Sequence, residues 1–336
     1  MKDLAIFRCD ASPEIGAGHA ARCLALADAF ADAGSEVLFA VNAAARETFP
    51  ALKRFRTEIV PAGKTDEPQW LGELADGKNA SLVLDLRETS EEYEAACKRW
   101  AKKLAIIADF PDRRHDCDVL IDQTIGREAR EYASLVPENC KILTGAQFAL
   151  VGKPFAGLRG EAQQRRKGVP AKRILLTFGA TDPFNYLGRL LPALIEHASG
   201  LKIDIAAGSR PLDDVQVTIE RQVGAISVLR DAEEMPQALL AADLAVGLAG
   251  TSAWERCVLG LPSALFIPSD YYRLATERLA ATGAVTVIGG NDFEPADMAR
   301  KIVELTRDAA KLAQMSARAF TLCDGKGAAR IVNALR

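Results

Sequence analysis

A glycine-flanked histidine, Gly16-Ala17-Gly18-His19, has the residue types and spacing most suited to chemistry. The run Leu4–Arg8 before it, apolar in its first four residues, predicts a short buried strand, and residues 20–33 predict a helix that ends at Gly34. His19 therefore lies at a helix start, where free amides favour an anion and an imidazole can exchange a proton near neutral pH. This spacing predicts acid–base chemistry beside an anion, although a tight turn with an exposed histidine also fits a single glycine pair.

A second segment with chemical potential is Gly250-Thr251-Ser252, which follows an apolar strand-like run and precedes a helical one. Free amides and hydroxyl groups at such a turn suit a diphosphate. Glu255 follows one helical turn later. The alternative interpretation is a capped helix that carries a solvated surface glutamate.

These segments are positioned by apolar runs that alternate with helical ones, which indicates parallel α/β units. The predicted strands are 4–8, 36–41, 82–86, 104–108, 119–122, 174–178, 202–206, 226–229, 244–246, 264–267 and 285–288. The polar residues between Leu158 and Ala171 predict a linker. We therefore expect two Rossmann-like domains, 1–158 and 172–336, that face each other across a cleft, with the last helix able to pack back on the N-terminal domain.

Composition and charge exclude several classes of function. The 336 residues carry a net charge of −3 and no basic block, so neither nucleic acid nor an anionic membrane is an expected partner. The seven cysteines lack a Cys-x-x-Cys pair, so neither a disulfide framework nor a zinc site is predicted. The first predicted strand begins too early for a signal peptide, and no apolar run reaches membrane-spanning length, so we expect a cytoplasmic protein without membrane insertion. Residues 39–42 lack the acidic residue that NAD binding requires, and no metal or other cofactor is expected.

The N-terminal segment also carries three short patterns in order: Arg-x-Asp-x-Ser, Ile-Gly-x-Gly-His and Arg-Cys-Leu-x-Leu-Ala. It resembles the signature of the nucleotide-sugar hydrolases that release UDP in pseudaminic acid synthesis and of the related spore-coat polysaccharide proteins, which are relatives of glycosyltransferases of the GT-B type. The resemblance implies a GT-B fold of two Rossmann-like domains. It also implies that His19 is the catalytic general base.

In the second half, Gly250-Thr251 with Glu255, and the run Trp254 to Pro262 around it, also resemble this superfamily. The resemblance implies that Gly250, Thr251 and Ser252 bind the phosphates, that Glu255 binds the ribose hydroxyls and that Met235 closes over the base. The Gly179-Ala180-Thr181-Asp182-Pro183 loop resembles the family's Gly-Gly-x-Asp-Pro loop, although a plain Asp-Pro turn also explains it.

The expected substrate-binding residues are Arg8, Asp10, Gly16, Gly18, Asp85, Arg87, Gly179, Thr181, Asp182, Tyr271 and Tyr272. Polar residues that follow the family pattern without an assigned role are Asp109, Arg113, His115, Asp118, Asp122 and Gln123. Arg87 stands where the family usually has tyrosine, and Tyr271-Tyr272 replace an Asn-Gln pair. These departures leave the sugar open.

The resemblance implies hydrolysis of a UDP-sugar, in which water attacks the anomeric carbon with His19 as general base while UDP leaves. The family substrate is UDP-2,4-diacetamido-2,4,6-trideoxy-β-L-altrose, a precursor of sialic-acid-like sugars on flagellin or surface polysaccharides. A GT-B glycosyltransferase with an acceptor hydroxyl in place of water is the nearest alternative. A catalytically silent nucleotide-sugar-binding protein is the alternative from another class. The oligomeric state is not predicted.

Overall fold

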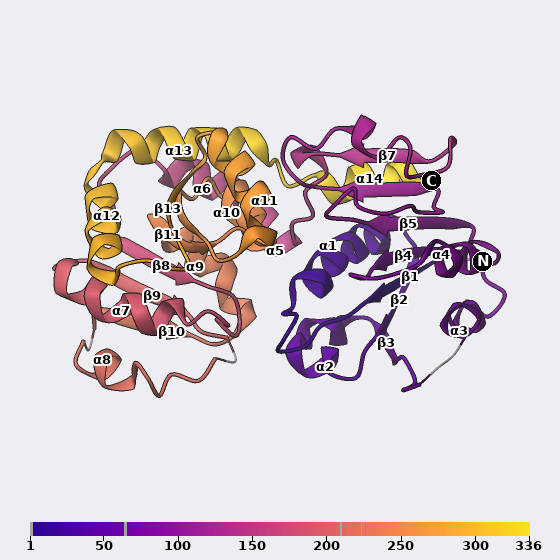
Figure 1. Cartoon of the computed structure of the whole chain (residues 1–336), viewed down its shortest axis with the longest axis horizontal. Coiled ribbons are helices and arrows are strands. Elements are labelled where there is room, and N and C mark those ends of the chain that lie inside the picture. The colour runs from indigo at the N-terminus through magenta and orange to yellow at the C-terminus, as the bar shows by residue number, and fades with distance from the viewer. Residues whose placement is uncertain (1–2, 64–65, 209, 223) are drawn as a thin grey trace. The chain divides into compact units, whose positions relative to one another are not determined.

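The computed structural model describes residues 3–63, 66–208, 210–222 and 224–336. The chain divides into two compact units, of which unit 1 comprises Met1–Lys153 and Gly325–Arg336, and unit 2 comprises Pro154–Asp324 (Figure 1). Each unit contains one parallel β-sheet. The predicted class of two parallel-sheet α/β domains is therefore confirmed.

Unit 1 has a seven-stranded sheet in the order β3 (Arg56–Ile59), β2 (Glu36–Val41), β1 (Leu4–Cys9), β4 (Ala80–Asp85), β5 (Lys103–Ile107), β6 (Val119–Asp122) and β7 (Lys141–Thr144). The edge strands β3 and β7 are the ones that the sequence pattern does not predict. Both are short and mostly half-buried or exposed, so they lack the continuous apolar run of a central strand.

Alternate residues of β1 face the two layers of helices in unit 1. Phe7 and its neighbours two positions away pack with α1 (Gly18–Asp32) and α14 (Gly327–Leu335). Ile6 packs on the opposite face with α3 (Glu67–Leu74) and α4 (Glu91–Lys98). The short helix α2 (Ala45–Thr48) also lies in unit 1, and α5 (Lys153–Gly157) crosses from unit 1 into unit 2 after Lys153. The C-terminal helix thus belongs to the core of the unit that contains the N-terminus.

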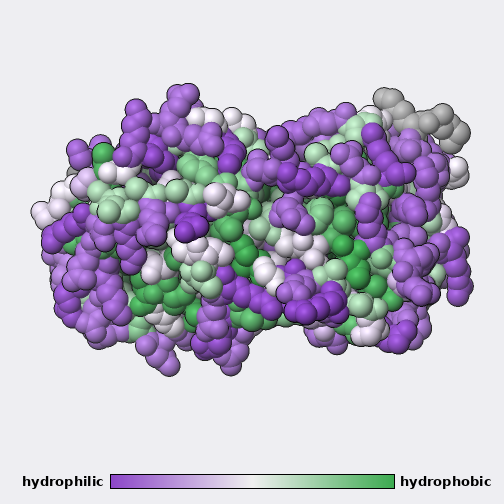
Figure 2. All heavy atoms as spheres, turned by 90° about the horizontal axis from the view of Figure 1, so that it is seen from above, coloured by the Kyte–Doolittle hydropathy of each residue, from purple (hydrophilic) through white to green (hydrophobic). Residues whose placement is uncertain are grey.

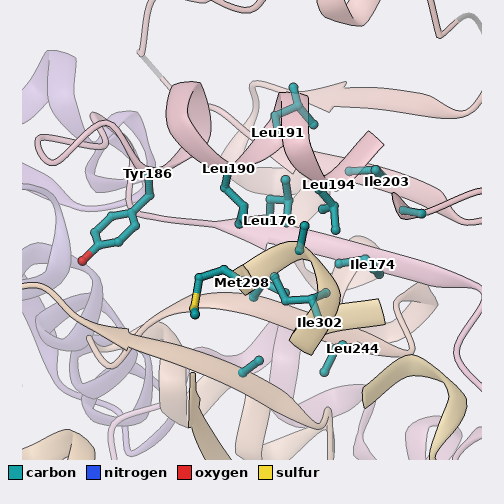
Figure 3. Packing of buried hydrophobic residues seen from close by; sticks show 14 of the residues in the cluster. Ile174, Leu176, Tyr186, Leu190, Leu191, Leu194, Ile203, Leu244, Met298 and Ile302 are labelled. Carbon is teal, nitrogen blue, oxygen red and sulfur yellow. The ribbon is translucent and has the colours of Figure 1, made fainter. Parts of the chain in front are cut away.

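Unit 2 has a six-stranded sheet in the order β10 (Ile226–Leu229), β9 (Lys202–Ala206), β8 (Arg173–Thr177), β11 (Leu244–Leu248), β12 (Ser263–Ile267) and β13 (Val285–Gly290). On one face, Leu190 and Leu194 of α7 (Tyr186–His197) and Ile302 of α12 (Pro295–Arg307) pack against Ile174 and Leu176 (Figure 3). The other helices are α8 (Gln216–Glu220), α9 (Met235–Ala241), α10 (Ser252–Val258), α11 (Asp270–Ala281) and α13 (Ala309–Leu322).

The segment expected to be a linker forms helix α6 (Arg159–Arg165) and lies within unit 2. Arg159 donates hydrogen bonds to the carbonyls of Val258, at 3.0 Å, and Phe320, at 2.9 Å. Arg166 donates to those of Leu239 and Leu259 at 2.9 and 3.0 Å. These carbonyls lie at or near the ends of α9, α10 and α13, where unpaired carbonyls carry partial negative charge. Arg159 and Arg166 therefore stabilise helix ends, and the segment forms part of unit 2.

Hydrophilic side chains cover most of the face shown in Figure 2, with smaller areas of hydrophobic residues among them. Within the described ranges, no helix is both long enough and apolar enough to cross a lipid bilayer.

Candidate active site

Both sheets reverse their strand order next to their first strand. In unit 1, β1 lies between β2 and β4, and in unit 2, β8 lies between β9 and β11. Ligands of open parallel sheets bind beyond the carboxyl ends of the strands at such a reversal. The predicted loops follow β1, β8 and β11, and Asp85 is the last residue of β4. The sheet topology therefore places a candidate site at each reversal.

The loop after β1 delivers His19 to the first turn of α1. Gly16 donates a backbone hydrogen bond of 2.7 Å to the Ser12 carbonyl and has a φ of 77°, a conformation that favours glycine. Helix α1 begins at Gly18, and the His19 side chain is 17% exposed. The predicted order of strand, glycine loop and helix is thus present, and the imidazole keeps a path to solvent.

His19 is held by a buried carboxylate. Its Nδ1 atom lies 2.6 Å from Oδ1 of Asp85, whose side chain is fully buried. In the tautomer in which Nδ1–H donates to Asp85, the lone pair of Nε2 is left to accept a proton. The pair therefore has the arrangement of a histidine general base and its orienting carboxylate.

Arg22, one turn further along α1, joins this pair to a second carboxylate. Its Nε and Nη2 atoms each lie 2.6 Å from an Asp85 oxygen, and its Nη1 lies 2.6 Å from Asp109. Burial alone would raise the pKa of Asp85, but the charge and hydrogen bonds of Arg22, and then of His19, hold that pKa well below its usual range. Asp85 therefore stays ionised at neutral pH.

The geometry of Asp85 does not support the predicted contact with a sugar hydroxyl. Its side chain has no exposed surface, and both oxygens already accept hydrogen bonds from Arg22. Asp109 lies two residues beyond β5 and pairs with Arg22. Its side chain is 30% exposed, and the sequence alone assigns it no role. The sequence signal for it was its position after a predicted strand.

Arg8 and Asp10 form a second polar group at the ends of β1 and β2. The Arg8 guanidinium contacts Asp10, and its Nε lies 2.6 Å from Glu67. The backbone amide of Asn42 donates a hydrogen bond of 3.0 Å to the Asp10 carboxylate. Arg8 and Glu67 also line a cavity of about 380 Å³. The structure thus joins Arg8 and Asp10 to each other and to Glu67, whereas His19 is bound to Asp85.

In unit 2, the three predicted site residues in the loop after β8 differ in how exposed they are. Gly179 is exposed with a φ of 91°, and Thr181 is half-buried. Asp182 is buried, accepts hydrogen bonds from the amides of Tyr186 and Leu187 at 2.9 and 2.8 Å, and lies 3.3 Å from Arg210. The carboxylate of Asp182 therefore shapes the start of α7 and is not available for the predicted contact with substrate.

The loop after β11 exposes Gly250, while Thr251 and Ser252 are half-buried. Glu255 is half-buried on α10, and none of the described residues forms a hydrogen bond or ion pair with its carboxylate. Burial raises the pKa of Glu255 to about 7, opposed by the positive charge of Arg256. A desolvated carboxylate without a protein donor is suited to accept hydrogen bonds from a ligand.

The remaining predicted residues lie at the surface or at helix starts. Arg87 is exposed two residues after β4. Met235 is half-buried as the first residue of α9. Tyr271 and Tyr272 lie in the first turn of α11 with ring centroids 5.2 Å apart, and Tyr271 is 42% exposed.

His115 belongs to a separate buried network. Its Nδ1 lies 3.0 Å from Glu94, which also accepts hydrogen bonds from Thr89 and Arg113. In the part of the chain that the structure describes, no three His, Cys, Asp or Glu side chains gather in a way that could hold a metal ion.

Comparison with known proteins agrees with this architecture. Residues 174–333 match the glycosyltransferase family 28 C-terminal domain. A UDP-2,4-diacetamido-2,4,6-trideoxy-beta-L-altropyranose hydrolase of Campylobacter jejuni is 25% identical over 150 residues, which are 45% of this chain and 52% of that protein. A UDP-N-acetylglucosamine--N-acetylmuramyl-(pentapeptide) pyrophosphoryl-undecaprenol N-acetylglucosamine transferase of Clavibacter sepedonicus is 29% identical over 185 residues, 52% of this chain and 48% of that protein.

The chain spans about half the length of these curated relatives. The crystal structure of Acinetobacter baumannii MurG superposes with a TM-score of 0.68 at 15% identity, over 100% of this chain and 99% of that one. With its two parallel sheets and a C-terminal half that matches glycosyltransferase family 28, the chain has the GT-B glycosyltransferase fold.

Proposed function

We propose that the protein is an enzyme that cleaves the bond between UDP and the anomeric carbon of a UDP-activated amino or deoxy sugar, with water as the nucleophile. The observation that carries this proposal is the His19–Asp85 pair at the strand reversal of unit 1, with its Nδ1–Oδ1 distance of 2.6 Å. The similarity to the Campylobacter jejuni hydrolase supports the choice of water as the nucleophile and of an amino or deoxy sugar.

In this mechanism His19 takes the proton from water as the oxygen attacks the anomeric carbon. The bond from that carbon to the diphosphate oxygen breaks, and its electron pair leaves with UDP. Asp85 orients the imidazole and stabilises the imidazolium that forms. Asp85 thus has a positioning role. Asp109, whose side chain is partly exposed, is the carboxylate that can accept a hydrogen bond from a sugar hydroxyl.

Unit 2 supplies the nucleotide-binding residues in this proposal. Gly250, Thr251 and Ser252 bind the diphosphate, Glu255 accepts hydrogen bonds from the ribose hydroxyls, and Met235 lies against the base. The match to the family 28 C-terminal domain and the absence of a described partner for the Glu255 carboxylate support these roles. Gly179 and Thr181 are proposed to contact the substrate through the accessible part of their loop.

Transfer of the sugar to an acceptor hydroxyl is the second candidate, because the Clavibacter sepedonicus relative is a transferase and the family 28 match is to a glycosyltransferase domain. The discriminating experiment incubates the protein with a panel of UDP-sugars, with and without acceptors, and follows both UDP and the sugar product. Release of UDP with an equal amount of free reducing sugar supports hydrolysis. UDP release only when an acceptor is present, with formation of a glycoside, supports transfer, and binding without UDP release supports a silent protein.

A further inference from the structure

Arg256 is the largest of the fully buried side chains in the described chain, with 1% of its surface exposed. It lies on α10 directly after Glu255. Its guanidinium donates hydrogen bonds to the Leu248 carbonyl at 2.6 Å and to the Ser252 hydroxyl at 3.2 Å. Among the described residues, no carboxylate forms an ion pair with it, and its buried Nε has no partner. Arg256 is therefore a buried cation that the protein only partly satisfies.

Other buried arginines of the chain are fully engaged. Arg22 and Arg127 each lie 2.6 Å from a buried carboxylate. The half-buried Arg166 lacks an ion pair among the described residues, but all three of its nitrogens donate to carbonyls at helix ends. A buried guanidinium without such partners carries a desolvation cost. The burial of Arg256 lowers its pKa to about 10, against the opposing influence of Cys257 and Glu255, so the group remains charged at neutral pH.

The two groups that Arg256 binds lie on either side of the Ala249-Gly250-Thr251 turn, in which Gly250 is exposed. We propose that Arg256 is a positioning residue for the anionic part of the ligand of unit 2: it fixes this turn and provides the positive charge that a diphosphate offsets. The inference rests on the proposed function, which assigns the diphosphate to this turn. It predicts that Arg256 distinguishes a nucleoside diphosphate from the uncharged nucleoside.

The test is calorimetric titration of the full chain with UDP and with uridine. Arg256→Lys keeps the charge, whereas Arg256→Gln keeps hydrogen-bonding capacity without it. We expect Arg256→Gln to weaken UDP about tenfold or more while uridine stays within about twofold, because only the charged ligand loses a charge partner in a low-dielectric site. Arg256→Lys is expected to retain most of the preference for UDP. An equal loss for both ligands, or no loss for UDP, would overturn the proposal.

Arg166→Gln is the control, because Arg166 is a half-buried arginine of unit 2 that also binds carbonyls and has no ion pair among the described residues. It is expected to lower the melting temperature without changing the ratio of UDP to uridine affinity, and a changed ratio would assign the effect to general loosening of unit 2. If Arg256→Gln does not fold, the UDP to uridine ratio of Arg256→Lys decides, since a ratio near that of the wild type supports the charge role and a lost ratio overturns it. Failure of the wild-type chain to bind UDP would instead contradict the proposed function.

Discussion

The two units place polar groups at the same position of similar sheets, but they satisfy them differently. In unit 1, Arg22 links the buried Asp85 to Asp109, and Asp85 holds His19, all at 2.6 Å. In unit 2, the carboxylate of Glu255 has no described protein partner and Arg256 is only partly satisfied. A network closed within the protein fixes the geometry that proton transfer needs. Polar groups that lack protein partners are suited to bind a ligand that provides the missing hydrogen bonds or opposite charge.

Burial acts on the carboxylates of the two units with opposite outcomes. The pKa of Asp85 is held well below its usual range because Arg22 outweighs the effect of burial. The pKa of Glu255 rises to about 7 because burial outweighs the charge of Arg256. The difference comes from direct ion pairing, which Asp85 has and which Glu255 lacks among the residues that the structure describes. Asp85 is thus a permanent anion, while Glu255 titrates near neutral pH.

Among the variants of the two units, Asp85→Asn is expected to have the strongest effect. The change leaves His19 without its charged partner and Arg22 with one carboxylate. We expect UDP release to slow by about two to four orders of magnitude and the free energy of unfolding to fall by about 3 kcal/mol. Asp109→Asn, which alters a 30% exposed partner of the same Arg22, is the control and should cost less stability. Enzyme assays and urea unfolding measure both effects, and a Kd for UDP that rises in step with the loss of rate would refute the division of roles.

Removal of the Glu255 carboxylate should weaken UDP binding, whereas the Asp85 variant should slow the chemical step. Glu255→Ala is expected to weaken UDP by about 1–3 kcal/mol, the range of hydrogen bonds to a charged group. Glu304→Ala, which removes an exposed glutamate from α12, provides the matched control and should leave UDP affinity unchanged. Calorimetry measures both variants. Equal affinities for the wild type and Glu255→Ala would assign Glu255 to the protein surface.

The raised pKa of Glu255 predicts that UDP binding depends on pH. With a pKa of about 7, the carboxylate is mostly ionised at pH 8 and mostly protonated at pH 6, so the affinity it confers falls as the pH falls. We expect up to about a tenfold loss of UDP affinity between these values. In Glu255→Gln, titration of the UDP phosphates still contributes to the pH dependence of UDP affinity, but titration of the Glu255 carboxylate does not. Parallel pH profiles for the two proteins would exclude Glu255 as the titrating group.

The smallest effects are expected for the residues that depart from the family pattern. Arg87→Ala and Tyr272→Ala should change the relative rates with different UDP-sugars by about 1 kcal/mol and leave UDP affinity unchanged. The expected substrate therefore differs from the altrose derivative in its sugar. Full activity on that derivative, with no response to either variant, would show that these positions do not select the sugar.

The parts of the fold that the sequence predicts are those with local signals. Central strands such as β1 and β11 are mostly apolar and buried, and the glycine loops after them mark the candidate sites. Edge strand β3 and helix α6 lack such signals. Helix α6 is stabilised by guanidinium contacts with helix ends up to 164 positions away in the chain. Only the tertiary structure brings those carbonyls to it.

The candidate site shows the same limit. His19 and Glu255 are predictable because each follows a strand, a glycine turn and a helix start. The role of Asp85 cannot be predicted from the sequence, because its partner Arg22 lies 63 positions away and because burial decides whether the carboxylate can contact a ligand. The same limit holds for Asp182, whose carboxylate accepts hydrogen bonds from two backbone amides at the start of α7. Arg256 had a local signal, an arginine among the apolar residues Trp254, Cys257 and Val258, which indicates a buried cation.

In the proposed mechanism, unit 1 carries out the chemical step while unit 2 holds the nucleotide. Turnover and UDP affinity measured on the same preparation of His19→Asn, with circular dichroism to verify the fold, separate these two roles. Asparagine keeps some hydrogen bonding but cannot accept the proton. This mechanism predicts a turnover lower by about two to four orders of magnitude with a Kd for UDP within about twofold of the wild type. Near-normal turnover, or a loss of UDP affinity proportional to the loss of rate, would contradict it.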